Sequence, residues 1–257
     1  MSGINFLSEN YYKTATVSIT TGTANAQFPL VNLKNDSPSI KFRSSGNTVV
    51  VEVDLLQTRD IDTLSLLGSP TEDFGMTAVT FKTSVTNDFS SSPVNTLTLV
   101  PSQNMGYSYI TEVNHRFVQI TFTGQGSYVE VGHIFIGSRV SLLYQNLTID
   151  SFNYEYADKS KMTENDYGQV FINELPLVKS LSGSIEVCTK DEQETLDDMF
   201  IRHGIHEPIW MIVDKDGTGM NEGESKLTIY GYLKSVPRWG GKGGQHFDTS
   251  LSVKAAV

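Results

Sequence analysis

The sequence predicts a mainly β protein made of two successive β-sandwiches, the second of which carries one flanking helix. Short alternating runs rich in Ser, Thr and Val recur from residue 14 to residue 140, with turn residues between them. Only the segment from Thr189 to His203 combines helical spacing with start and stop signals. Alternating strands lie before and after that segment, and this arrangement is typical of an α+β layout.

Composition limits the classes of function. The chain has 257 residues, enough for one large or two ordinary domains, and its formal net charge is −10. This charge argues against wrapping nucleic acid or lying on an anionic membrane, and no basic cluster offsets it. Cys188 is the only cysteine, so no intrachain disulfide is expected and the thiol is interpreted as a small strand residue.

The first residues and the hydropathy pattern indicate where the protein resides. Residues 1–10 have neither a basic start nor a long apolar core, so we expect no signal peptide. No apolar stretch approaches the ~20 residues that a membrane span needs. We therefore expect a soluble protein made in the cytoplasm, unless it leaves within an assembly.

The first half of the chain is expected to form strands only. The clearest strands are residues 48–55, 63–67, 78–83, 117–122 and 128–136. Turn and loop residues lie between them at 44–47, 68–70 and 90–93. Many short strands at this spacing, with no helix between them, predict an antiparallel sandwich.

The order of motifs in this half carries a resemblance. The motifs are Phe28–Leu33, the Asp36–Pro38 loop, Phe42–Ser44, Val51–Leu55, Ile61–Leu64, Phe81–Ser84, Arg116–Ile120 and Val131–Gly137. Their order resembles the discoidin-type, galactose-binding-like jelly roll over about residues 14–138. Many members of that family bind glycans or lipid head groups through loops at one end. The cysteine pair that often ties the ends is missing, and the sequence shows no cluster of exposed aromatic residues for stacking on sugars.

The expected helix, about residues 189–203, is the segment around which the second domain is organised. Thr189 can accept from the backbone N–H of Glu192, whose carboxylate can reach back to the Thr189 N–H. The expected apolar face consists of Leu196, Met199, Phe200 and His203. Gly204 and Pro208 end the helix, and the apolar run Ile209–Val213 that follows predicts a strand buried on both faces.

The two domains are expected to be residues 1–138 and 139–257. Further strands of the second domain are predicted at 141–151, 168–173, 179–187, 226–233 and 247–253, and Asn153–Met162 predicts a strand that leaves into a polar loop. Polar loops are expected at Tyr156–Asp166, Asp214–Ser225 and Trp239–Gln245. Their Gly, Lys and Asp content gives little apolar area, so we expect at least one of them to be ordered mainly by a neighbouring molecule.

The second domain carries another resemblance. The motifs are Tyr156–Lys161, Gly168–Phe171, His203–Gly204, Pro208–Ile212 and Ile229–Leu233. They resemble the C-terminal part of tail proteins of long-tailed phages, in which a discoidin-like module often precedes a tail-tube or distal-tail sandwich. The resemblance implies a virion structural protein of the tail tip, forming a homo-oligomeric, sixfold ring that joins the tube to the baseplate, hub or fibres. It implies no sequence-specific nucleic acid and no membrane insertion.

Five features of the sequence are candidate sites. Asp214–Ser225 matches the start of a calcium loop, yet Ser225 stands where a bidentate glutamate is expected and strands flank the segment, which favours a hairpin connection. His203 and His206 have a spacing seen in metal sites but lie on either side of Gly204. Trp239–Gly244 lacks the residues that follow a phosphate loop, Asp197–Asp198 is interpreted as a solvated pair, and the Asn146–Thr148 sequon requires secretion.

The sequence therefore assigns no catalytic, cofactor-binding or metal-binding residue, and we expect no enzyme. The leading hypothesis is the tail-tip ring protein. The first alternative is a carbohydrate-binding module used for attachment to a host receptor, and both roles can coexist in one chain. The second alternative is an accessory domain of an enzyme, or a hydrolase whose carboxylates the sequence does not pair.

Overall fold

The computed structural model describes residues 3–68, 75–101, 104–143, 152–175, 177–214, 227–241 and 246–256. They form mainly antiparallel strands with one α-helix, which confirms the predicted fold class. The chain divides into two compact units. The N-terminal unit runs from Phe6 to Val140, and the C-terminal unit contains the described residues after Val140 together with residues 3–5.

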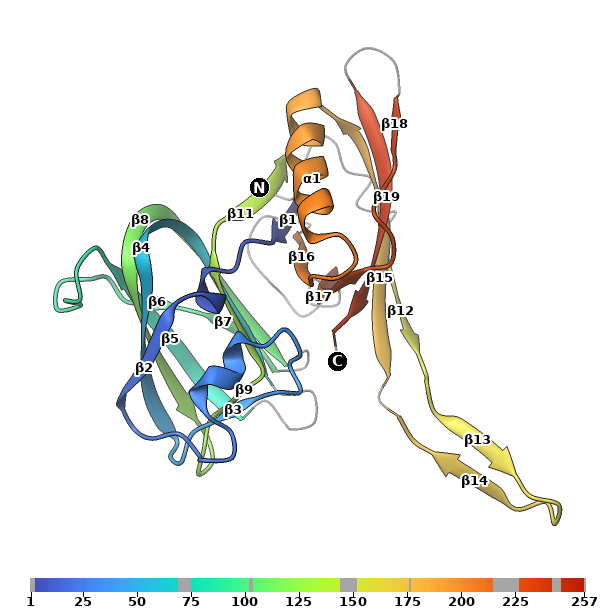
Figure 1. Ribbon diagram of the computed structural model, residues 1–257, viewed down its shortest axis with the longest axis horizontal. Coiled ribbons are helices and arrows are strands. Elements are labelled where there is room, and N and C mark those ends of the chain that lie inside the picture. Colours follow the sequence, from blue (N-terminus) through green and yellow to red (C-terminus); the bar gives the residue numbers. More distant parts are fainter. Residues whose placement is uncertain are drawn as a thin grey trace. The chain divides into compact units, whose positions relative to one another are not determined.

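The N-terminal unit is a β-sandwich with two short 3-10 helices (Figure 1). Its elements are η1 (Tyr11–Lys13), β2 (Thr16–Thr21), η2 (Leu30–Lys34), β3 (Phe42–Arg43), β4 (Thr48–Leu67), β5 (Met76–Ser84), β6 (Asn95–Thr96), β7 (Thr98–Val100), β8 (Met105–Gly124), β9 (Glu130–Val131) and β10 (His133–Gly137). Strands β4 and β8 pair along most of their length, with β10 and β2 beside β4 and with β5 and β7 beside β8. Strands β3 and β9 form a separate pair.

Strand β4 is longer than the sequence predicts, because it joins the segments 48–55 and 63–67 that were expected as two strands. The chain bends at Leu56, whose φ is 68°, where the Asp54 carboxylate accepts from the Leu56 N–H at 2.8 Å. The ladder to β8 shifts register between Asp54 and Arg59 and then continues. The polar residues at this bend interrupt the alternation, so the sequence predicts two separate strands on either side of it. Strand β8 is also longer, beginning at Met105 where only 117–122 was predicted.

The two halves of β4, before and after the bend, pair with different strands but pack into the same core. The first half pairs with β2 and the second half with β10. Buried side chains from both halves, among them Val51 and Leu66, belong to the same hydrophobic cluster as Phe81 and Ile120. Both halves of this long strand thereby contribute to one hydrophobic core.

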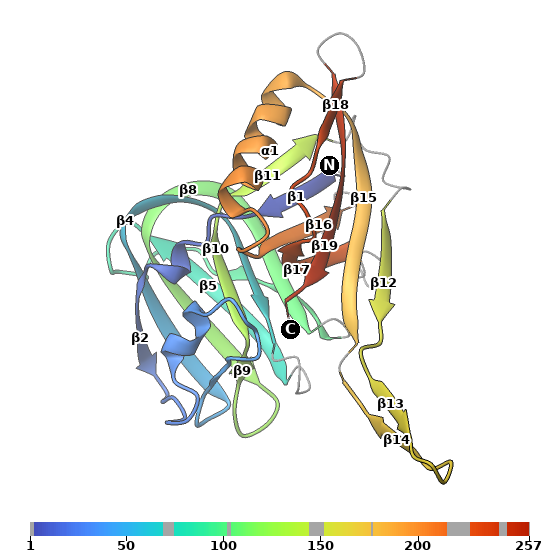
Figure 2. The same ribbon diagram turned by 45° about the vertical axis from the view of Figure 1, so that its right-hand side comes forward.

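The C-terminal unit contains an eight-stranded sheet, the helix and a separate hairpin (Figures 1 and 2). Its elements are β1 (Gly3–Leu7), β11 (Arg139–Leu143), β12 (Asn153–Ala157), β13 (Lys161–Glu164), β14 (Val170–Asn173), β15 (Val178–Cys188), α1 (Lys190–His203), β16 (Ile209–Asp214), β17 (Thr228–Leu233), β18 (Trp239–Gly241) and β19 (Phe247–Ala255). The order in the sheet is β11-β1-β16-β17-β19-β15-β12, with β18 paired to β19.

Helix α1 begins and ends as predicted. The Thr189 hydroxyl accepts from the Glu192 N–H at 3.3 Å, and the Glu192 carboxylate accepts from the Thr189 N–H at 2.9 Å, so the capping box is complete. Gly204 ends the helix with a φ of 53°, a conformation that strains residues with a Cβ atom. Leu196, Met199, Phe200 and His203 are buried, which confirms the predicted face.

Strand β16 confirms the second prediction drawn from this region, because each residue from Ile209 to Val213 is at most 1% exposed. Its neighbours in the sheet are β17 and β1. The sequence assigned all residues before 138 to the first domain, whereas residues 3–5 of β1 belong to the C-terminal unit. Independent folding of the N-terminal unit, expected for residues 1–138, stays a prediction, which a cooperative thermal transition of a fragment comprising residues 6–140 would establish.

Candidate binding surfaces

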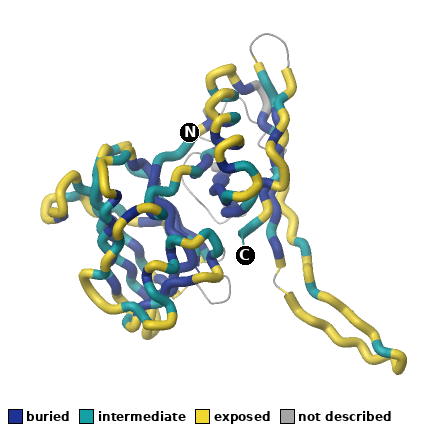
Figure 3. The backbone as a smooth tube through the Cα atoms, viewed as in Figure 1, coloured by how far each residue is buried: buried dark blue, intermediate teal, exposed yellow. Residues whose placement is uncertain are grey.

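Strands β13 and β14, with the turn between them, form a hairpin that we call the arm. It is a two-stranded sheet of its own, and every residue of both strands is exposed. Figure 3 shows the arm as a yellow hairpin that leaves the sheet from the ends of β12 and β15. The sequence predicted a polar loop from Tyr156 to Asp166. That prediction is wrong, because Lys161–Glu164 forms a ladder with Val170–Asn173.

The tip of the arm is ordered by its own hydrogen bonds. The Asn165 side-chain oxygen accepts from the backbone N–H groups of Tyr167 at 3.0 Å and Gln169 at 2.9 Å. Gly168, with a φ of 74°, donates its N–H to the Asn165 carbonyl at 3.0 Å. An Asn-led turn with glycine in the left-handed region is a common hairpin connection. It holds the Tyr167 side chain 92% exposed at the tip.

The arm has one apolar face. Met162 lies opposite Ile172 and Glu164 lies opposite Val170, so these four side chains share a face. The exposed fractions are 70% for Met162, 52% for Val170 and 58% for Ile172. An isolated two-stranded hairpin is marginally stable in water, and a contiguous exposed apolar face on a soluble protein marks an interaction surface.

A second surface gathers aromatic and charged side chains on the N-terminal unit. The Arg43 guanidinium lies 4.3 Å from the ring centre of Tyr128 and 4.9 Å from that of Phe28. Its Nε donates to Glu130 Oε2 at 2.7 Å, and Lys41 Nζ lies 2.8 Å from Glu130 Oε1. Tyr128 is 36% exposed, whereas Glu130 is buried. We call Phe28, Arg43 and Tyr128 the arginine stack.

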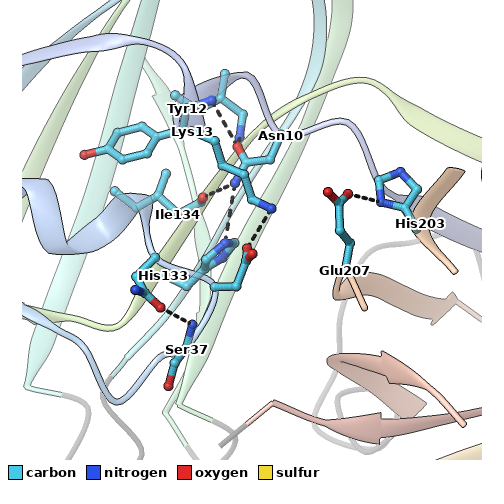
Figure 4. A network of polar contacts seen from close by, with 11 residues as sticks. Asn10, Tyr12, Lys13, Ser37, His133, Ile134, His203 and Glu207 are labelled. Atoms are coloured by element: carbon cyan, nitrogen blue, oxygen red, sulfur yellow. Dashed lines mark hydrogen bonds and ion pairs between the residues drawn. The ribbon is translucent and has the colours of Figure 1, made fainter. Parts of the chain in front are cut away.

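The structure does not bring the two histidines of the candidate metal spacing together. His203 is buried and its Nδ1 lies 2.9 Å from Glu207 Oε2, a contact shown in Figure 4, whereas His206 is exposed. Among the residues that the structure describes, no group of three or more His, Cys, Asp or Glu side chains is placed to hold a metal ion. Of Asp214–Ser225, the calcium-like segment, residues 215–225 lie outside the described part of the chain, as does the Asn146–Thr148 sequon.

Other sequence candidates have structural roles. Trp239–Gly241 is strand β18 rather than part of a loop, and residues 242–245 lie outside the described part of the chain. The Trp239 indole N–H donates to Asp197 Oδ1 at 3.1 Å, so Asp197 ties that strand to the helix, while Asp198 is exposed. Burial and the nearby Glu192 raise the pKa of the Cys188 thiol to about 11, which suits the predicted small strand residue.

Figure 4 also shows a polar network that fastens β10 to the first turn of the N-terminal unit. The Asn10 side chain accepts from the backbone N–H groups of Tyr12 and Ile136, each at 3.1 Å, and donates to the Ile134 carbonyl at 2.7 Å. Its amide nitrogen lies 3.5 Å from His133 Nε2. Burial, aided by Lys13, lowers the pKa of His133 to about 3.

This buried histidine predicts a loss of stability in mild acid. Below the ordinary histidine pKa of about 6.5, His133 binds a proton in the unfolded chain but stays neutral in the folded protein. The free energy of unfolding therefore falls as the pH falls. At pH 5 the expected contribution is a loss of about 2 kcal/mol, from about 1.4 kcal/mol per pH unit. Between pH 7.5 and pH 5, the free energy of unfolding measured in urea should fall less for His133→Gln than for the wild-type chain. Equal decreases would contradict the role of His133.

Sequence reasoning missed the arm, although a signal for it was present. Asn165-Asp166-Tyr167-Gly168 is turn chemistry, and Met162, Val170 and Ile172 alternate with polar residues on both sides of that turn. The arginine stack had no comparable signal, since Phe28, Arg43 and Tyr128 are far apart in sequence. Pairing of β3 with β9 brings Arg43 near Tyr128, and the Arg43 backbone N–H donates to the Phe28 carbonyl at 3.1 Å.

None of the described helices has the length and hydropathy needed to cross a membrane. No protein-family model and no curated protein sequence matches the chain. Among solved structures, similar ones include a Streptococcus pneumoniae fucose binding module, SpX-3 (11% identity, TM-score 0.42, 51% of this chain and 98% of that chain). Another is the family 32 carbohydrate-binding module of C. perfringens NanJ in complex with galactose (10% identity, TM-score 0.41, 51% and 98%).

A third similar structure is the lectin domain of lectinolysin complexed with Lewis B antigen (9% identity, TM-score 0.43, 51% and 97%). These matches are similarities of backbone structure, and each covers about half of this chain. They give no support to a phage-tail identity.

Proposed function

We propose that the chain is a structural subunit of a phage tail tip, where copies form a ring that joins the tail tube to the baseplate, hub or fibres. The observation that carries this proposal is the arm, an ordered hairpin with an exposed apolar face and an exposed aromatic tip. Another protein that covers such a surface would stabilise it further. The resemblance of the second domain to tail-tube and distal-tail proteins supplies the biological setting.

The test removes the arm and leaves the sheet intact. Ala157 and Val178 lie opposite each other in the β12–β15 ladder, so replacing residues 158–177 by Asn-Gly closes that ladder with a two-residue turn. We expect the wild-type chain to form a closed oligomer by sedimentation velocity and electron microscopy. We expect the shortened chain to melt at nearly the same temperature and to remain a monomer. A wild-type chain that stays monomeric at all concentrations, or that is absent from tail tips of the parent particle, overturns the proposal.

A second candidate function is glycan binding by the N-terminal unit, favoured by the arginine stack. A partly exposed aromatic ring beside a guanidinium offers an apolar face together with a positive charge, which is a combination suited to a polar ligand with an apolar side. A glycan array probed with the wild-type chain tests it. Tyr128→Ala should abolish any signal, and Val85→Ala, at another exposed apolar residue of the same unit, should preserve it. An array without signal removes this candidate.

A further inference from the structure

We infer that the arms of two copies of the chain pair with each other along β14, so that the two hairpins form one four-stranded antiparallel sheet. The partner is a β-strand because β14 offers an open strand edge, and the residues of β14 favour a second β14. This contact goes beyond the proposed function, since it joins two copies whether or not the chain belongs to a phage tail.

The outer edge of β14 is open. Within the described part of the chain, β14 pairs with β13 and with no other strand. The Asn165 N–H donates to the Gln169 carbonyl at 3.0 Å, and opposite residues of an antiparallel ladder alternate between hydrogen-bonded and non-hydrogen-bonded pairs. The backbone N–H and C=O groups of Val170 and Ile172 therefore point away from β13. Such an edge binds a further strand through main-chain hydrogen bonds, and a hairpin of two strands gains stability from it.

Strand β14 lacks the features with which proteins block an open edge. Its residues, Val170–Asn173, include no charged side chain and no proline. The other strand of the arm, β13, carries Lys161 and Glu164. The strands at the two ends of the eight-stranded sheet carry charges as well, Arg139 in β11 and Glu155 in β12. Charged side chains on an edge oppose pairing with a further strand, so among these strands β14 has the edge best suited to it.

The sequence of β14 is complementary to itself. In an antiparallel pair centred on Phe171, Val170 of each copy lies opposite Ile172 of the other, and Phe171 lies opposite its own counterpart. The two Phe171 residues then form a non-hydrogen-bonded pair, the kind in which cross-strand side chains lie closest. Val170 and Ile172, which are 52% and 58% exposed, join the apolar faces of the two arms into one surface. Asn173 faces Gln169 of the other copy, so no charged residues lie opposite each other in this register.

Electrostatics favour a contact at this place. Each copy carries a formal net charge of −10, so two copies repel at long range and meet best where neither presents charge. The arm leaves the large sheet as a separate hairpin (Figure 3), so another strand can reach β14 without displacing a strand of the large sheet. In the centred register the two Glu164 carboxylates lie at opposite corners of the four-stranded sheet, which keeps like charges apart.

The contact has twofold symmetry. Both copies use the same surface, and an isologous contact of this kind stops at two copies. A ring therefore needs a second contact at another surface, with arm-joined pairs as its building units. The symmetry also supplies the test, because only a residue on the twofold axis meets itself.

The experiment introduces a disulfide at the twofold axis of the full-length chain. Phe171→Cys places two thiols opposite each other at the Cα separation of about 4.5 Å of a non-hydrogen-bonded pair, which a disulfide can span. Cys188 is the only native cysteine and is buried, so it stays in place. Oxidation with copper phenanthroline should convert most of this variant into a covalent dimer in a non-reducing gel.

Two matched controls lie on the same face of the arm. Thr163 is opposite Phe171 in β13, and Asn173 lies two residues further along β14. In the centred register each of these residues is about 14 Å from its own counterpart, given the spacing of strands and of residues along a strand. Thr163→Cys and Asn173→Cys should therefore remain monomers in the same gel.

A charge on the edge gives an independent measurement without cysteine chemistry. Ile172→Lys should weaken self-association in sedimentation velocity about tenfold or more, because it places a lysine from each copy on the paired edge. Val94→Lys, at an apolar residue of the N-terminal unit that is 60% exposed, should leave the association unchanged.

The outcomes separate this inference from the proposed function. Equal cross-linking at positions 163, 171 and 173 indicates random collisions and overturns the inference. If Phe171→Cys does not cross-link while the wild-type chain forms a closed ring, the arm has another partner; the inference is overturned and the ring stands. Cross-linking at position 171 alone, with no wild-type assembly larger than a dimer, supports the paired arms and overturns the ring. A wild-type chain that stays monomeric, without cross-linking at position 171, overturns both.

Discussion

Phe200→Ala is expected to lower the free energy of unfolding of the C-terminal unit by about 3–5 kcal/mol, because a fully buried phenylalanine leaves a cavity that the surrounding structure fills only in part. Phe200 is 0% exposed and belongs to the single buried face of helix α1. Together with the completed capping box, that face fixes the helix against its unit. Phe200 is one of the three large apolar side chains on that face, so its truncation should destabilise the whole unit.

The two tryptophans make the measurement specific. Trp210 and Trp239 are the only tryptophans of the chain and both lie in the C-terminal unit, so their fluorescence during urea unfolding reports on that unit alone. Ile201→Ala is the matched control, since Ile201 is 65% exposed on the same helix and its truncation should change stability by less than about 0.5 kcal/mol. A loss below about 1 kcal/mol for Phe200→Ala would show that the helix does not anchor this unit.

The sequence predicted those parts of the fold that depend on neighbouring residues. Thr189 with Glu192, the spacing of Leu196 and Phe200, and the Gly204 cap are local signals, and the helix follows from them. Ile209–Val213 was recognisable as buried because a continuous apolar run needs cover on both faces. Such features require no knowledge of distant strands.

Other parts depend on pairing between distant segments. The segments before and after Leu56 were predicted as two strands because polar residues break the alternation there, although the ladder to β8 continues past the bend. Strand β1 enters the second sheet beside β16, and nothing in residues 3–7 indicates a partner two hundred residues away. The turn of the arm has a local signal in the sequence. Its exposed apolar face, in contrast, can be recognised only once the register of its two strands is known.

The arginine stack illustrates the same limit for a site. Arg43 and Glu130 become neighbours because β3 pairs with β9 in a register that places these two residues opposite each other. Their side chains then form an ion pair with an Nη2–Oε2 distance of 2.5 Å, and Lys41 joins it. Lys41 and Arg43 are two residues apart, but no spacing rule within the sequence connects them with Glu130.

Glu130→Ala is expected to destabilise the N-terminal unit by about 3–5 kcal/mol, because removing one partner of a buried ion pair leaves uncompensated charge. The Glu130 side chain is 5% exposed and that of Lys41 is 10% exposed, so water cannot replace the lost carboxylate at Lys41. Arg43, at 21%, is better hydrated and contributes less. Urea unfolding followed by far-ultraviolet circular dichroism measures the loss, and the tryptophan fluorescence of the C-terminal unit serves as an internal reference.

The matched control is an ion pair of the N-terminal unit in which the distance between nitrogen and oxygen is similar. Lys13 Nζ lies 2.7 Å from Asp36 Oδ1, but these side chains are 30% and 35% exposed. Lys13→Met should therefore cost no more than about 1 kcal/mol. The double variant Lys41→Met with Glu130→Met should recover most of the stability lost in Glu130→Ala, because apolar groups of similar size can replace a buried pair. If Glu130→Ala costs no more than Lys13→Met, the buried carboxylate does not hold β3 to β9, and the geometry of the arginine stack has another origin.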